Sequence, residues 1–176
     1  NYLPGVPEGS DLCITPVSAP ENHYVRIKAD NRLDADGTLR GTFTLTAEGQ
    51  SDSNIRRIFT TGFQSEWKST MERQLLAISP KARLLSVDYG KNPKDYQAAP
   101  IKITFRYEIP DYALRGEGEM FFRPMVMNNL YNQVRSYIWI DTSVENRKYG
   151  FKDGCSRLVE LDETIQLPAG YKLVSA

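Results

Sequence analysis

The sequence has few of the residues that carry chemistry near neutral pH. Its 176 residues include one histidine and two cysteines, which leaves few groups for acid–base catalysis, thiol chemistry or metal binding. Lysine plus arginine and aspartate plus glutamate number 22 each, so the formal net charge is zero. Without a basic excess we expect neither a nucleic-acid-binding protein that acts through counterion release nor a polybasic membrane-surface protein.

Long apolar runs are also missing. No stretch approaches the roughly 18 apolar residues of a membrane-spanning helix, so we expect no membrane span. The first residues, NYLPGVPEGSDL, lack a basic segment followed by an apolar one, and we do not expect them to be a signal peptide. Cys13 and Cys155 lie far apart, and the sequence has no C-x-x-C pair for structural zinc. We interpret them as small apolar residues in or near the core, with one long-range disulfide as the alternative.

The clearest pattern is a long stretch of alternating residues. Odd-numbered apolar residues alternate with polar ones from 24 to 29 and again from 38 to 47, as in half-buried strands. Asp34-Ala35-Asp36-Gly37 lies between the two runs and is a strong turn signal. These residues therefore predict an antiparallel hairpin.

The period changes after Gly49 and predicts a helical hairpin inserted at about residues 50–79. Apolar residues then recur every three to four positions, at Ile55, Ile58 and Phe59 and at Trp67, Met71, Leu75 and Ile78. Pro80 ends the second helix. At this spacing the apolar stripe is typical of a surface that faces the core.

Strand-like patterns return after residue 80. We expect strands at 82–89, 101–109, 112–115, 119–126, 137–140, 159–167 and 171–174, and an edge strand at 12–17. In the run from 159 to 167 the odd positions are apolar except for Glu163. No helix is expected between successive strands after residue 80, which excludes a doubly wound fold.

The predicted fold class is therefore mainly β. We expect an antiparallel β-sandwich, immunoglobulin-like or jelly-roll-like, with the helical hairpin packed against it. Residues 1–11 read as a linker or as the tail of an upstream domain, and residues 12–176 as a single domain.

No catalytic or metal-binding group emerges from these residues. Cys13 lies in a strand-like run before Pro16, and His23 follows ten residues later, beyond Pro16 and Pro20, so we do not expect a nucleophile pair. We interpret His23 as a solvent-facing or hydrogen-bonded residue at a strand end. Asp34 and Asp36 lack the remaining ligand positions of a calcium loop, and we interpret them as part of a turn. We predict no catalytic residue, no metal site and no cofactor.

An aromatic and amide-rich stretch is the remaining candidate for a ligand or partner surface. Aromatic rings stack on sugars, and asparagine side chains bind hydroxyl groups. The alternative is that these rings fill the core. The candidate residues are Tyr112, Phe121, Phe122, Asn128, Asn129, Tyr131, Tyr137 and Trp139.

Several strings resemble a known family. PGVPEGSDL, TPVSAPENHYVRIKA, LRGTFTLTAEGQSDSNIRR, FRYEIPDYALRGEGEMFFRP and ETIQLPAGYKL are similar to the C-terminal accessory β domain of transglutaminase-like proteins from Bacteroidetes. The similarity runs from Gly5 to Val174 and consists of strand and turn patterns rather than catalytic motifs.

The resemblance implies a non-catalytic domain of the periplasm or cell surface. It would pack on or position a transglutaminase-like core that lies upstream in the same polypeptide. The function that we predict is therefore that of an accessory domain rather than an enzyme. A carbohydrate- or cell-wall-binding module, with a glycan or peptide as ligand, is the alternative.

Overall fold

A computed structural model describes residues 4–98, 100–126, 146, 148 and 155–174. Strands predominate, and two short 3-10 turns (Pro20–His23 and Gln64–Glu66) precede β1 and α2. The other elements, in chain order, are β1 (Tyr24–Leu33), β2 (Leu39–Ala47), α1 (Gly49–Thr60), α2 (Trp67–Leu76), β3 (Arg83–Asp88), β4 (Ile101–Ile109), β5 (Leu114–Arg115), β6 (Met120–Phe121) and β7 (Leu158–Gln166).

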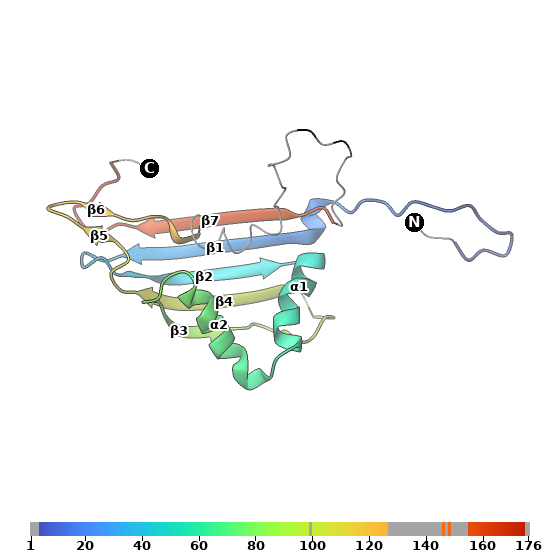
Figure 1. Ribbon diagram of the computed structural model, residues 1–176, viewed down its shortest axis with the longest axis horizontal. Helices are drawn as coiled ribbons and strands as arrows, with labels where there is room; N and C mark the ends of the chain where they lie inside the picture. The colour runs from blue at the N-terminus through green and yellow to red at the C-terminus, as the bar shows by residue number, and fades with distance from the viewer. Residues whose placement is uncertain (1–3, 99, 127–145, 147, 149–154, 175–176) are drawn as a thin grey trace.

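Five of these strands form one mixed sheet in the order β3-β4-β2-β1-β7 (Figure 1). The pairs β1–β2, β2–β4 and β3–β4 are antiparallel, whereas β7 is parallel to β1. The strands β5 and β6 make a separate two-stranded sheet. The hairpin predicted over residues 24–47 is confirmed by the pairing of β1 with β2.

The turn of this hairpin uses its carboxylates locally. Asp36 accepts a hydrogen bond from the backbone N–H of Thr38 at 2.9 Å, and the N–H of Gly37 donates to the carbonyl of Asp34 at 2.9 Å. This backbone hydrogen bond lowers the pKa of Asp36. The predicted turn is confirmed.

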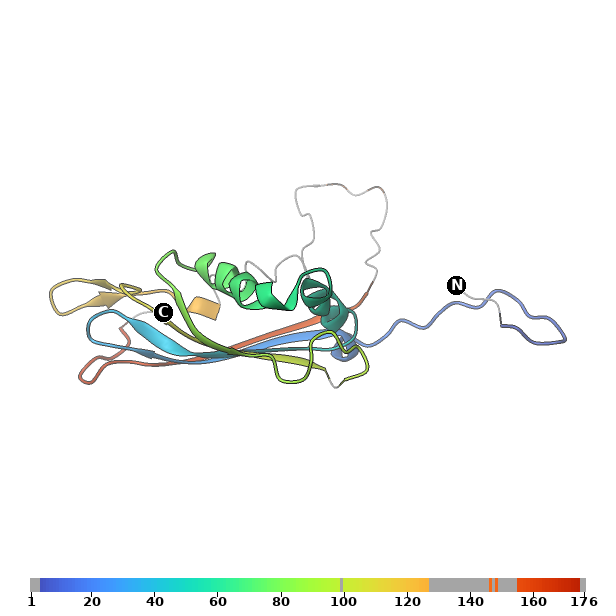
Figure 2. The same ribbon diagram turned by 90° about the horizontal axis from the view of Figure 1, so that it is seen from below.

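The two faces of the sheet differ in chemistry. Both helices lie on one side of the sheet (Figure 2). The inner face, toward the helices, carries the apolar row of each strand, and registered neighbours such as Ala29, Phe43 and Phe105 share it. The outer face carries arginine, lysine, threonine and acidic residues in the intervening positions.

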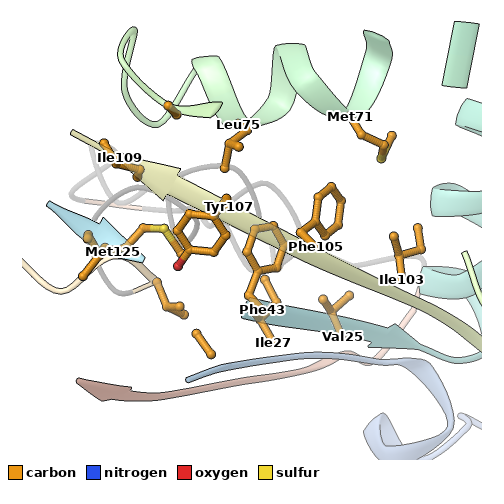
Figure 3. Close-up of a cluster of buried hydrophobic side chains, with 14 of the residues drawn as sticks. Val25, Ile27, Phe43, Met71, Leu75, Ile103, Phe105, Tyr107, Ile109 and Met125 are labelled. Atoms are coloured by element: carbon orange, nitrogen blue, oxygen red, sulfur yellow. The ribbon is translucent and has the colours of Figure 1, made fainter. Parts of the chain in front are cut away.

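The helices contribute their apolar stripes to the core. Met71 and Leu75 of α2 are buried and point toward the aromatic side chains of β4 (Figure 3). Phe43 and Phe105 stack with their ring centroids 4.3 Å apart. Burial of each such side chain contributes about 2–3 kcal/mol. The helical hairpin predicted at 50–79 is confirmed, because α1 and α2 lie within this range but for one residue at the start.

Helix α1 begins against His23. The Nδ1 atom of His23 accepts a hydrogen bond from the backbone N–H of Gln50 at 3.1 Å, and the Ser51 hydroxyl donates to the His23 carbonyl at 2.9 Å. Gly49 has φ of +60°, and a Cβ atom there would overlap with His23 and the carbonyl of Asn22. The interpretation of His23 as a hydrogen-bonded residue at a strand end is confirmed.

A buried arginine fixes α1 to the loop that precedes β4. Arg56 is 2% exposed, and its Nε lies 2.7 Å from a carboxylate oxygen of Asp52. Its Nη1 donates to the carbonyl of Pro93 at 3.1 Å, while the other Asp52 oxygen accepts from the N–H of Ile101 at 2.7 Å. A charge this deeply buried is stable because it is paired and hydrogen-bonded.

Several predicted features need correction. A sheet-rich fold is confirmed, but the described residues do not confirm a sandwich, because helices cover the inner face and the outer face is polar. The sheet is mixed rather than antiparallel, since β7 returns beside β1 in the same direction. The strands expected at 12–17 and 171–174 are wrong, and the one expected at 119–126 is reduced to Met120–Phe121. The strand expected at 137–140 lies outside the described residues.

Candidate functional site

The structure describes three of the eight predicted surface residues. They are Tyr112, which precedes β5, Phe121, which ends β6, and Phe122, which follows it. Tyr112 and Phe122 are half-buried against the core, whereas Phe121 is 61% exposed. The three rings therefore do not form one exposed surface. Asn128, Asn129, Tyr131, Tyr137 and Trp139 lie outside the described residues.

Tyr112 is held by the chain rather than presented to solvent. Its hydroxyl donates a hydrogen bond to the carbonyl of Arg123 at 2.7 Å. Burial and the nearby carboxylate of Glu163 raise the pKa of Tyr112 to about 12. Both effects disfavour the phenolate, because burial and a like charge raise the free energy of the ionised form.

Phe121 has an exposed apolar neighbour. It lies directly opposite Leu114 in the β5–β6 pair, and Leu114 is 74% exposed. Side chains directly opposite one another in antiparallel strands are in contact range. The pair makes a small apolar patch on the hairpin, which we call the Leu114–Phe121 patch.

A polar cluster lies on the inner face of the main sheet, where apolar residues are expected. The hydroxyl of Tyr107 donates to Oδ1 of Asn31 at 2.5 Å, and Nδ2 of Asn31 donates to Oε1 of Glu163 at 2.8 Å. The Glu163 carboxylate also accepts from the backbone N–H of Met125 at 3.2 Å and of Val126 at 2.8 Å. The cluster therefore joins β1, β4 and β7 to the segment that carries Met125 and Val126.

Solvent does not reach Tyr107, which is the fully buried member of this cluster. Burial raises the pKa of the Tyr107 phenol, and the Glu163 carboxylate raises it further. The phenol therefore stays protonated and acts as a hydrogen-bond donor. Every polar group of the cluster is matched to a partner, so the arrangement stabilises the docking of Met125 and Val126 on the sheet.

Gly41 makes room for this cluster. It pairs with Asn31 on one side and Tyr107 on the other, and a Cβ atom at Gly41 would overlap with Asn31 Oδ1. The sequence carried a signal for the cluster in Glu163, the polar member of an otherwise apolar row. Asn31 occupies the same kind of position in the row of Val25, Ile27, Ala29 and Leu33. That second signal was missed.

The structure describes both cysteines and the histidine, and each is placed by local contacts. Cys13 and Cys155 are free thiols of intermediate exposure, so they form no long-range disulfide, and neither belongs to the buried core that they were interpreted to lie in or near. Their Sγ atoms approach the backbone carbonyls of Asp11 and Ser156. His23 is engaged by α1, as described above. Within the described part of the chain, no three His, Cys, Asp or Glu side chains gather as ligands for a metal ion.

No relative identifies the chain. Comparisons with protein-family models, with curated proteins and with solved structures found no match. Among the described helices none is long and apolar enough to span a lipid bilayer.

Proposed function

We propose that the chain is a non-catalytic accessory domain that packs on another part of the same polypeptide, and that this part is a transglutaminase-like core. The resemblance described above supports this proposal. Its setting is the periplasm or the cell surface, as in the family that the sequence resembles.

The observation that carries the proposal is the segment before the sheet. This segment runs from Pro4 to Ala19 and extends away from the sheet (Figure 1). Three of its apolar side chains, Leu12, Ile14 and Val17, are 65%, 82% and 85% exposed. Burial of a side chain of this kind against a partner contributes about 1.5–3 kcal/mol. We propose that these residues contact the neighbouring core.

The test is association between this chain and the polypeptide encoded immediately upstream of it. We expect binding in a calorimetric titration, weakened about tenfold or more by Ile14→Asp. Leu76→Asp is the matched control, because Leu76 is an exposed apolar residue on α2. No association, or equal loss in the two variants, would contradict the proposal.

The non-catalytic part has its own test. The isolated chain is expected to show no peptide cleavage and no cross-linking activity. Activity that disappears in Cys13→Ala would overturn this part of the proposal.

Carbohydrate or cell-wall binding is the second candidate, and the exposed Phe121 ring favours it. An apolar ring face stacks on the CH groups of a sugar. Titration with cell-wall saccharides should then produce binding that Phe121→Ala abolishes and Tyr24→Ala leaves unchanged. No binding of the wild-type chain at millimolar saccharide would remove this candidate.

A further inference from the structure

The outer face of the main sheet contains a hollow of about 570 Å³. It is lined by residues of β1, β2 and β4, among them Asp30, Thr42 and Arg106, and by Leu85 of β3 and Thr164 and Gln166 of β7. A volume of this size is within the range of small-ligand sites, about 300–1,000 Å³. Asp30, Thr42 and Arg106 lie on the polar face of the sheet, opposite the helices. The lining also includes Asn31, Gly41 and Tyr107, so the hollow backs directly onto the strand positions that carry the polar cluster on the other face.

Three of the lining residues form one row across the sheet. Asp30 pairs with Thr42 in the β1–β2 register, and Thr42 pairs with Arg106 in the β2–β4 register. Neighbouring strands are about 4.8 Å apart, so the Cα atoms of Asp30 and Arg106 are separated by roughly 10 Å. The row therefore has the Asp30 carboxylate at one end, the Thr42 hydroxyl in the middle and the Arg106 guanidinium at the other end.

These two charges lack partners within the described part of the chain. Neither Asp30 nor Arg106 takes part there in an ion pair or a side-chain hydrogen bond. The other two cations of the lining are already paired. Arg32 lies 2.9 Å from a carboxylate oxygen of Asp34, and Arg40 pairs with Asp34 and with Glu108.

The ligand that complements this row carries one positive and one negative group. We propose that the hollow binds a short peptide with free termini, whose ammonium group contacts Asp30 and whose carboxylate contacts Arg106. An extended tripeptide spans about 10 Å, which matches the separation of the two residues. The guanidinium presents parallel N–H donors that suit a carboxylate. The Thr42 hydroxyl can donate to or accept from the peptide backbone between the two ends.

This site is independent of the proposed packing on an upstream core. It uses the outer face of the sheet rather than the segment before β1. Failure of one proposal therefore leaves the other in place.

The experiment is a titration of the isotopically labelled chain with tri-alanine, followed by backbone amide chemical shifts. We expect saturable shifts centred on Thr42 and its neighbours in β1 and β4. N-acetylated tri-alanine lacks the ammonium group, and C-amidated tri-alanine lacks the carboxylate. Each should bind about fivefold more weakly, which is the upper range for one exposed ion pair.

Variants assign the two ends of the ligand. The Asp30→Asn variant should bind free tri-alanine about fivefold more weakly than the wild type does. Its affinity for the N-acetylated peptide should equal that of the wild type. The Arg106→Gln variant should likewise bind free tri-alanine more weakly, and its affinity for the C-amidated peptide should equal that of the wild type. Asp162→Asn and Lys102→Gln are matched controls, because these charges lie on the same face outside the lining of the hollow and should leave binding unchanged.

Three results would overturn the proposal. The first is the absence of saturable shifts. The second is equal affinity for free and blocked peptides. The third is a loss in the control variants as large as that in Asp30→Asn and Arg106→Gln. All four positions are exposed, so these variants should retain the amide dispersion of the folded chain.

Discussion

Glu163 offers the most demanding test of the fold. Its carboxylate accepts three hydrogen bonds, from the Asn31 side chain and from the backbone N–H groups of Met125 and Val126. Glu163→Ala removes all three acceptors and leaves buried donors without partners. A hydrogen bond to a charged group contributes about 1.5–3 kcal/mol, and an unsatisfied buried donor costs about 1–3 kcal/mol. Because these contributions overlap, we expect a loss of about 3–4 kcal/mol in the free energy of unfolding.

A matched control lies on the same strand. Glu160 points to the outer face and pairs with Arg26, and both side chains are about half exposed. An exposed pair contributes about 0.2–1 kcal/mol, so Glu160→Ala should cost less than 1 kcal/mol. Glu163→Gln should be intermediate. Its amide oxygen can still accept from Asn31 and Met125, whereas its NH₂ group would face the Val126 N–H.

The assay is urea unfolding followed by circular dichroism, combined with amide hydrogen exchange. In Glu163→Ala the amides of Met125 and Val126 should exchange faster than in Glu160→Ala, because only the first variant releases that segment. If the two variants unfold at the same urea concentration, the inner polar cluster does not stabilise the fold and the reasoning is refuted.

Three further predictions concern Arg56, Gly41 and Tyr112. Arg56→Met should lower the free energy of unfolding, measured in urea, by about 3 kcal/mol, because it leaves the Asp52 carboxylate without its buried partner. The control Arg57→Met changes an exposed neighbour and should alter this free energy by no more than about 0.5 kcal/mol. Equal losses in the two variants would contradict the prediction. Gly41→Ala should cost about 2–3 kcal/mol, because its Cβ overlaps with Asn31, and an unchanged midpoint would show that the overlap is relieved. The pKa of Tyr112, raised to about 12, exceeds its unfolded value of about 10. The unfolded chain therefore loses that proton first as pH rises, and stability should fall between pH 10 and about 12. Tyr112→Phe should flatten this decline, and an unchanged slope would contradict the assignment.

The sequence predicted the local elements well. Alternation along residues 24–47 and 101–109 depends on neighbours two positions apart, and the helical stripes of 50–79 depend on neighbours three and four positions apart. These patterns are set by the backbone geometry of a single segment. The role of His23 at a strand end and the turn at Asp34-Ala35-Asp36-Gly37 also followed from adjacent residues.

The covering of the sheet could not be predicted in the same way. One apolar face indicates that something packs on it, but the pattern is the same whether a second sheet or a pair of helices does so. The alternating pattern describes a single sheet. The predicted sandwich went further, because it also assumed which layer packs on that sheet. The Pro- and aromatic-rich run at 119–126 misled for a related reason, because Met125 and Val126 are buried by docking near Glu163 rather than by strand pairing.

Sequence alone thus determined which segments become strands or helices and which side of each is apolar, because these choices rest on short-range geometry. Only the tertiary structure decided that β7 lies parallel to β1, and this placement brings Glu163 next to Asn31. It also decided that Asp30 and Arg106 share a row on the outer face. Such neighbours are far apart in the chain, and their contact depends on the order and register of whole strands, which no local pattern specifies.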